Sequence, residues 1–314
     1  MENIKLIKNN APHIRVKKST TTVMLDVIIA MLPAMAAAIY FFGIRSLWLT
    51  LVTVAACVIS EALVQKALGK KVRVKDLSAV VTGMLLAFNL PVEYPFWMAI
   101  VGGVFAIVIV KELFGGIGQN FLNPALAARI FLMVTWPAEI GTFTYDGVAG
   151  ATPLGGRPAS LVDLFIGNIP GTIGEVSKLA ILIGCAYLVV RGVIKLRMPL
   201  VYTLGCAVFL YIFKYDLADT LYQLLSGGII FAAVFMVTDY SSSPMSKQGK
   251  VIYALGAALL TVVIRLWGAY PEGVSFAILI MNAFVPTIDR YVRATVFGTG
   301  GKKWENKDHL LPQF

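Results

Sequence analysis

The hydroxyl group of Thr152 lies in a stretch of small residues, YDGVAGATPLGGR (145–157), between two long apolar blocks. A threonine hydroxyl can accept a covalent substituent when the surrounding backbone leaves it accessible. The four glycines of the stretch let another protein approach the backbone closely. Pro153 favours an extended conformation at Thr152, which projects its side chain. Composition alone is equally compatible with an ordinary surface loop.

A second group of polar side chains lies in or beside the apolar blocks. Asn120, Asn123 and Arg129 share an interrupted segment that contains NPALAAR, and Asp239 lies in the turn TDYSSSP (238–244). Amide and guanidinium groups near the start of a short helix suit a polar or anionic ligand. An arginine paired with backbone carbonyls is the alternative. The turn could contact a polar cofactor or a quinone-like ring, or simply cap a helix.

Other ionisable side chains fall near the ends of apolar blocks. Such groups are costly inside a membrane and are candidates for function, although snorkelling or a local ion pair also explains them. They are Asp26, Glu61, Glu112, Arg265 and Asp289. The three cysteines lie far apart and form no CxxC motif. We therefore expect no zinc or iron–sulfur ligand set from this chain alone.

These side chains must be positioned by membrane-spanning helices. Of the 314 residues 58% are hydrophobic and only 14% are charged, and the mean hydropathy is +0.79. A soluble domain carries about 25% charged residues. Several apolar runs approach the ~20 residues that span a bilayer as a helix. The composition therefore predicts an all-α polytopic membrane protein.

Ten apolar blocks are predicted to be spans, five before and five after the segment 137–175. They are 23–43, 46–65, 77–90, 96–113, 120–136, 176–190, 199–213, 220–237, 251–268 and 274–292. An odd number of spans per half predicts that the second half is inverted relative to the first. The expected organisation is a tail (1–22), a first repeat (23–136), a loop (137–175), a second repeat (176–292) and a tail (293–314).

Three of these blocks are short or interrupted, namely 77–90, 120–136 and 220–237. Short or broken helices often line a cavity near the middle of the membrane. We therefore expect a buried ligand or a pathway where such helices meet.

The distribution of basic residues predicts the orientation. Of the 27 Lys and Arg residues, 21 fall in the two tails and in alternate loops. The positive-inside rule then places both termini in the cytoplasm and the loop 137–175 outside it, in a cell membrane. The same asymmetry accounts for most of the net charge of +10, so nucleic-acid binding is not needed to explain it.

Five segments of the chain resemble a known membrane protein. DGVAGATPL (146–154) resembles the flavinylation motif Asp-Gly-x-Ser/Thr-Gly/Ser-Ala-Thr, apart from Ala149, where the motif has Ser or Thr. The other four are DLSAVVTGMLLAFNLP (76–91), FLNPALAARIF (121–131), MVTDYSSSPMSKQGK (236–250) and NAFVPTIDRY (282–291). Together they resemble the D subunit of the Rnf complex, in a family shared with the B subunit of the Na⁺-translocating NADH:quinone reductase.

The resemblance implies FMN joined through its phosphate to Thr152, with Asp146, Gly150 and Ala151 as motif residues. It implies a flavin transferase for maturation, and an electron-relay role between ferredoxin and NAD⁺ coupled to Na⁺ or H⁺ translocation. The implied partners are the A, B, C, E and G subunits, above all the flavin-bearing G subunit.

Some relatives also hold a non-covalent riboflavin. Asn120, Asn123, Arg129 and Asp239 are the residues that we expect near such a flavin. An inverted-repeat solute channel or transporter, or a structural subunit without redox function, remains the alternative for the whole chain.

Overall fold

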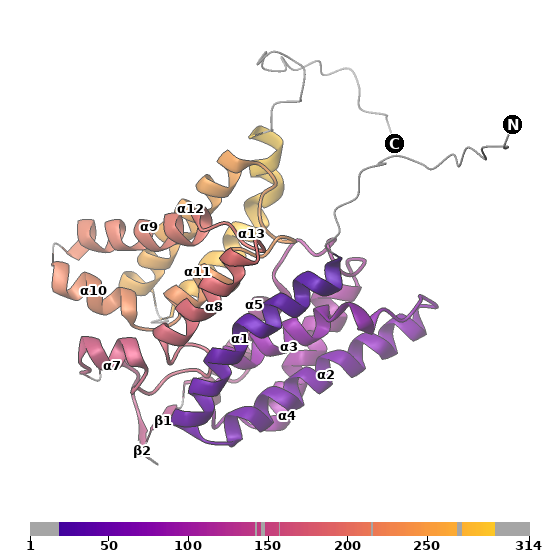
Figure 1. The fold of residues 1–314 in the computed structure, drawn as a ribbon, viewed down its shortest axis with the longest axis horizontal. Helices are drawn as coiled ribbons and strands as arrows, with labels where there is room; N and C mark the ends of the chain where they lie inside the picture. Colours follow the sequence, from indigo (N-terminus) through magenta and orange to yellow (C-terminus); the bar gives the residue numbers. More distant parts are fainter. Residues whose placement is uncertain are drawn as a thin grey trace, which may run out of the picture.

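In the computed structural model, helices occupy all ten predicted spans (Figure 1). The structure describes residues 19–141, 143–145, 148–156, 158–214, 216–268 and 272–292. Within these residues, four helices are long and apolar enough to cross a membrane, and a bent helix pair makes a fifth span. Three shorter apolar helices accompany them. The prediction of a polytopic helical membrane protein is confirmed.

The first half of the chain forms five spans, drawn in indigo to purple in Figure 1. Its elements are α1 (Thr20–Phe42), α2 (Arg45–Ala67), the short 3₁₀ turn η1 (Val74–Asp76), α3 (Ser78–Phe88), α4 (Phe96–Phe105), η2 (Ala106–Glu112) and α5 (Pro124–Thr135). α4 continues without a gap into η2, a segment of π-helix. The two together make the fourth span.

The second half repeats this order. Its elements are α8 (Lys178–Val190), α9 (Arg197–Lys214), α10 (Leu217–Leu225), α11 (Ile229–Phe235), α12 (Lys247–Trp267) and α13 (Val274–Tyr291). α10 and α11 are bent by 56° at a short break. Gly227 lies in this break with a positive φ of 64°, a conformation that glycine adopts at no steric cost.

The three interrupted blocks behave as predicted, and local sequence explains where their helices begin and end. α3 stops at Phe88 because Pro91 follows closely and disfavours helical backbone at the residue before it. α5 begins at Pro124, whose missing N–H is no loss at a first helical position. The side chain of Asn123 caps this helix by accepting from the N–H groups of Ala125 and Leu126.

The two halves meet through equivalent helices that run antiparallel. At the α1–α8 contact, Asp26 near the start of α1 accepts hydrogen bonds from Tyr187 and Arg191 at the end of α8. At the α5–α13 contact, Arg129 donates to Ser275 at the start of α13. First helix pairs with first and last with last, which is the arrangement that two inverted five-span repeats predict.

The segment between the halves contains small elements of its own. They are α6 (Pro137–Ile140), the strands β1 (Phe143–Tyr145) and β2 (Val148–Gly150), the 3₁₀ turn η3 (Pro153–Gly155) and α7 (Leu161–Ile166). The strands form an antiparallel hairpin in which Tyr145 is opposite Val148. This hairpin was not among the predicted elements, and it is the one two-stranded sheet in the described part of the chain.

The end of this connecting segment is built into the first half. Ile173 and Gly174 donate their backbone N–H groups to the carbonyls of Leu90 and Phe88, at 3.1 and 2.8 Å. A side chain at position 174 would collide with Phe88, since a Cβ there would stand 2.6 Å from the Phe88 Cβ. The strand-like pairing thus satisfies backbone carbonyls that are left open where α3 ends.

Candidate functional site

The loop around Thr152 presents its hydroxyl as the sequence predicts. Thr152 has extended backbone angles (φ −71°, ψ 166°), and its Oγ1 accepts a hydrogen bond from the N–H of Gly155 at 3.3 Å. The residue is partly exposed, and the preceding Ala151 is exposed. Gly150 ends strand β2. Asp146, the remaining motif residue, lies outside the described residues.

The same loop is anchored firmly behind the threonine. Pro153 is buried, and its carbonyl accepts a hydrogen bond from the hydroxyl of Tyr222 at 3.4 Å. The cavity behind Thr152 measures only about 10 Å³, and its lining includes Glu175, Lys178 and Glu272. A single water molecule needs ~10–15 Å³. Any large group on Thr152 must therefore extend outward from the protein and not into this cavity.

Arg129 lies in the interior of α5 and is already neutralised. It is buried, donates to the side chains of Asn89 (2.7 Å) and Ser275 (3.0 Å), and forms ion pairs with Glu175 (3.7 Å) and Glu272. This is neither the free anion site nor the simple backbone pairing considered from the sequence. The structure places it between two acidic partners, Glu175 of the connecting segment and Glu272 of the second half.

Asn120, Asn123 and Asp239 do come together, away from Arg129. The side-chain amide of Asn123 donates to Asp239 at 3.4 Å, and that of Asn120 donates to Ser241 at 3.3 Å. Asn123 and Arg129 are six positions apart on α5, which corresponds to about 9 Å along a helix. The structure therefore brings three of the four residues together and places Arg129 with other partners.

The turn that carries Asp239 is closed by its own hydroxyls. Ser242 donates to the Asp239 carboxylate at 2.8 Å, and Ser241 donates through both its N–H and its hydroxyl. Burial raises the pKa of the Asp239 carboxyl group, and these hydrogen bonds oppose the rise. The carboxyl group thus retains a proton to higher pH than an exposed aspartate does.

A cavity of about 130 Å³ opens beside this turn. Its walls combine apolar side chains with a few polar ones, the composition of a ligand site. Members from both halves include Val23, Ser78, Val81, Thr82, Leu85, Lys111, Asn120, Asn123, Val234, Phe235 and Asp239. The volume is roughly ten times that needed for one water. Asn120, Asn123 and Asp239, three of the residues expected near a ligand, therefore line one cavity, and the ligand itself stays a prediction.

The cavity and the Thr152 loop lie at opposite ends of the helices. The cavity is lined by Val23 and Met24 at the start of α1 and by Leu188 near the end of α8. Thr152 instead shares its small cavity with Lys178, the first residue of α8. The antiparallel helices α1 and α8 therefore connect the two sites.

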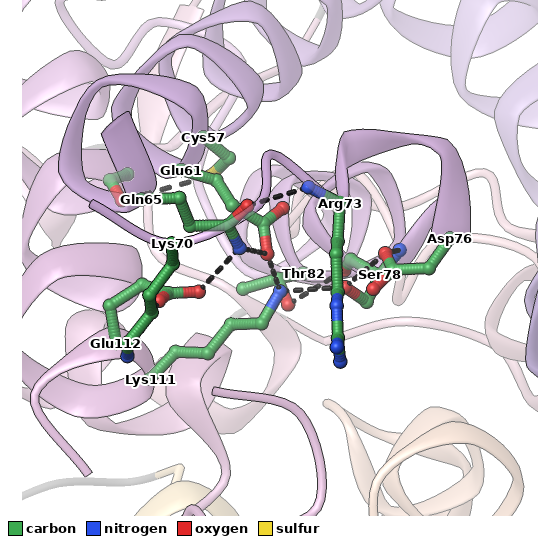
Figure 2. Close-up of polar contacts among 11 residues, drawn as sticks. Cys57, Glu61, Gln65, Lys70, Arg73, Asp76, Ser78, Thr82, Lys111 and Glu112 are labelled. Carbon is green, nitrogen blue, oxygen red and sulfur yellow. Dashed lines mark hydrogen bonds and ion pairs between the residues drawn. The ribbon is translucent and has the colours of Figure 1, made fainter. Parts of the chain in front are cut away.

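Lys111 lies at the end of the fourth predicted span, where it counts among the basic residues of the cytoplasmic side, and the structure shows that it is buried. Figure 2 shows it among the carboxylates of Glu61 and Glu112, with Gln65 and Ser78 close by. Lys111 donates to Glu61 and to Ser78, at 2.6 Å in each case. The side chain of Lys111 is only 3% exposed, so its ammonium group does not reach the protein surface.

Known proteins similar to this chain share its full length. A sequence profile of the NQR2, RnfD, RnfE family matches residues 7–298. The chain is 47% identical to the D subunit of the Na⁺-translocating ferredoxin:NAD⁺ oxidoreductase complex from Acetobacterium woodii, over 98% of this chain and 100% of that protein.

Two further relatives are each 36% identical to the chain. One is the D subunit of the proton-translocating ferredoxin:NAD⁺ oxidoreductase complex from Clostridium ljungdahlii, matched over 93% of this chain and 96% of that protein. The other is the D subunit of the ion-translocating oxidoreductase complex from Stutzerimonas stutzeri, matched over 91% and 94%. The match across nearly the entire chain, together with the polytopic helical fold, leads to one assignment. The chain belongs to the NQR2, RnfD, RnfE family.

Proposed function

We propose that this chain is the D subunit of an Rnf-type ferredoxin:NAD⁺ oxidoreductase, and that it relays electrons across the membrane. The observation that carries the proposal is the pair of sites at opposite ends of α8, the Thr152 loop and the cavity beside Asp239. A relay across a membrane needs a carrier near each face. A solute channel needs a continuous pathway and has no use for a projecting threonine in a flavinylation-like motif.

Thr152 is the proposed attachment point of FMN. Thr152 is partly exposed on extended backbone, and the cavity beside it is too small for a flavin, so a transferase would reach the hydroxyl from outside. In the attachment the Thr152 oxygen displaces AMP from FAD and forms a phosphodiester with the FMN portion, and the hydroxyl proton is released. The ester leaves the isoalloxazine ring free to accept and donate electrons.

The cavity beside Asp239 is the proposed site of a second flavin, non-covalent riboflavin. Riboflavin has no phosphate, so it does not need the arginine that the structure places elsewhere. Amide groups of Asn120 and Asn123 and the hydroxyls of Ser241 and Thr238 offer hydrogen-bond donors and acceptors around apolar walls. These residues would hold and orient the ring, and the apolar side chains would exclude water from it.

The orientation follows from charge. With both termini in the cytoplasm, the Thr152 loop faces outward and the Asp239 cavity lies on the cytoplasmic side, where Lys and Arg are concentrated. The proposed organisation of two repeats, 23–136 and 176–292, places one carrier on the connecting loop and the other between the repeats. The proposed electron donors and acceptors are the other Rnf subunits, with the flavin-bearing G subunit next to the outer loop.

The covalent flavin is tested by in-gel ultraviolet fluorescence of the denatured chain, produced together with a flavin transferase. We expect a fluorescent wild-type band that disappears in Thr152→Ala and persists in Thr144→Ala, a matched loss of a nearby hydroxyl. A non-fluorescent wild-type band from cells that flavinylate another target would contradict the attachment and favour the channel or structural alternatives.

A further inference from the structure

One member of a buried ion pair, Lys111, forms part of the wall of the Asp239 cavity. Lys111 at the end of η2 and Glu61 in α2 are 3% and 1% exposed, and their charged atoms are 2.6 Å apart. Removing two charges from water is costly, and two packed apolar side chains at such a place often stabilise a protein as well or better. Ionised groups retained inside a membrane segment therefore call for a functional explanation.

The surroundings of Lys111 hold its ammonium group in place and leave part of it available. Two of its three N–H groups donate, one to Glu61 and one to Ser78. No other acceptor for Lys111 is found among the described residues. Lys111 and Ser78 both line the cavity, so the remaining N–H is available to a ligand there.

The carboxylate of Glu61 is in turn positioned by Gln65, which lies beside it in Figure 2. Gln65 donates to Glu61 at 3.3 Å and to Glu112 at 2.9 Å. The other carboxylate oxygen of Glu61 has no partner within the described structure. The arrangement therefore places a cation at the cavity wall and its counter-charge one layer further out.

The backbone at Lys111 is unusual as well. Lys111 and Glu112 end a seven-residue π-helix, and π-helical turns are frequently found at functional sites. The wider turn brings two consecutive charged residues, both 3% exposed, into the protein interior. An ordinary helix end would let a lysine snorkel toward water.

We propose that Lys111, positioned by Glu61, sets the redox potential of the ligand in the Asp239 cavity by favouring its reduced, negatively charged form. The inference rests on the proposed function, which supplies an isoalloxazine ligand. When such a ring takes two electrons from a reduced flavin or iron–sulfur centre of a neighbouring subunit, together with one proton from water, it gains one net negative charge. The Lys111 ammonium attracts that charge across a medium of low dielectric constant.

The test uses the full-length chain in lipid nanodiscs with Thr152→Ala, so that only non-covalent flavin titrates. The midpoint potential is measured spectroelectrochemically in mildly acidic buffer, which keeps an unpaired amine protonated. We expect Lys111→Met to weaken the preference for reduced over oxidised flavin at least tenfold, which lowers the potential by about 30 mV for a two-electron couple. Glu61→Gln leaves the cation unopposed and should raise the potential. The double variant, which lacks both charges, should have a potential between those of the two single variants.

Lys70→Met is the matched control, because it removes the same charge from a lysine that is 44% exposed and 3.9 Å from Glu112. Solvent screens this charge, so the potential should not change. Equal potentials for Lys111→Met and Lys70→Met would overturn the inference, as would shifts of the same sign in Lys111→Met and Glu61→Gln. If Lys111→Met binds no flavin, Lys111→Arg must restore a flavin of nearly unchanged potential, and failure to do so would also overturn it.

The same preparation separates this inference from the proposed function. A Thr152→Ala chain without any non-covalent flavin, purified with riboflavin present, would overturn the second flavin site itself. A bound flavin whose potential ignores Lys111 would overturn only the role of the lysine.

Discussion

Replacing Gly184 by alanine is expected to force apart the two halves of the protein. Gly184 lies in α8 against α1, and a Cβ there would stand 2.1 Å from the carbonyl oxygen of Ala30. That oxygen belongs to the helix backbone and cannot rotate away as a side-chain tip can. The helices would have to separate by about 1.3 Å to reach the 3.4 Å of ordinary contact.

The expected cost is about 2 kcal/mol. Overpacking costs roughly 1–3 kcal/mol, and a backbone obstacle belongs at the upper end of that range. Alanine's greater helix propensity offsets ~1 kcal/mol of it. At ~2–4 °C per kcal/mol for a large chain, the midpoint of thermal unfolding should fall by roughly 4–8 °C.

The assay is thermal unfolding of the detergent-solubilised chain, with Gly102→Ala as the control. Gly102 is also a buried helical glycine, but its added Cβ would meet the tip of the flexible Leu132 side chain at 2.6 Å. Leu132 can change rotamer, so Gly102→Ala should lower the unfolding midpoint much less. A neutral Gly184→Ala, or equal losses in both variants, would refute the account of close backbone packing between the halves.

Two further predictions concern the buried charges and the orientation. Arg129→Met should destabilise the chain by ~3–5 kcal/mol, because it leaves the buried Glu175 and Glu272 without their cation. Arg129→Lys should recover part of this loss. If Arg129→Met were as stable as the wild type in the same unfolding assay, the ion-pair assignment would be contradicted. A cysteine introduced as Thr144→Cys should react with a membrane-impermeant maleimide in intact spheroplasts, whereas labelling only after lysis would reverse the proposed orientation.

The ten spans could be predicted because apolar length is a property of each segment by itself. The broken helices were also visible, since Pro91, Asn123, Pro124 and Gly227 act on their own backbone or on that of immediate neighbours. The hairpin of β1 and β2 was not predicted, although the sequence contains a turn motif typical of hairpins. The residues between its strands are Asp146 and Gly147, a dipeptide favoured at two-residue hairpin turns.

The charged interior could not be predicted in the same way, because it depends on partners far apart in the chain. Lys111 pairs with Glu61 fifty residues earlier, and Arg129 donates to Ser275 at a separation of 146 residues. A single sequence shows neither contact. Proximity in sequence suggested instead that Arg129 belongs with Asn123. About 1.7 helical turns separate the two residues, and Arg129 pairs with Glu175 and Glu272.

The pairing of 172–174 with the end of α3 has a consequence for how the chain is assembled. The carbonyls of Phe88 and Leu90 receive their N–H partners only after the connecting segment has been synthesised and has folded back. In a membrane, backbone groups left without partners are strongly unfavourable. The first five spans are therefore incomplete during biogenesis until the connecting segment has been made. The segment that carries Thr152 also supplies the hydrogen bonds that complete the first repeat.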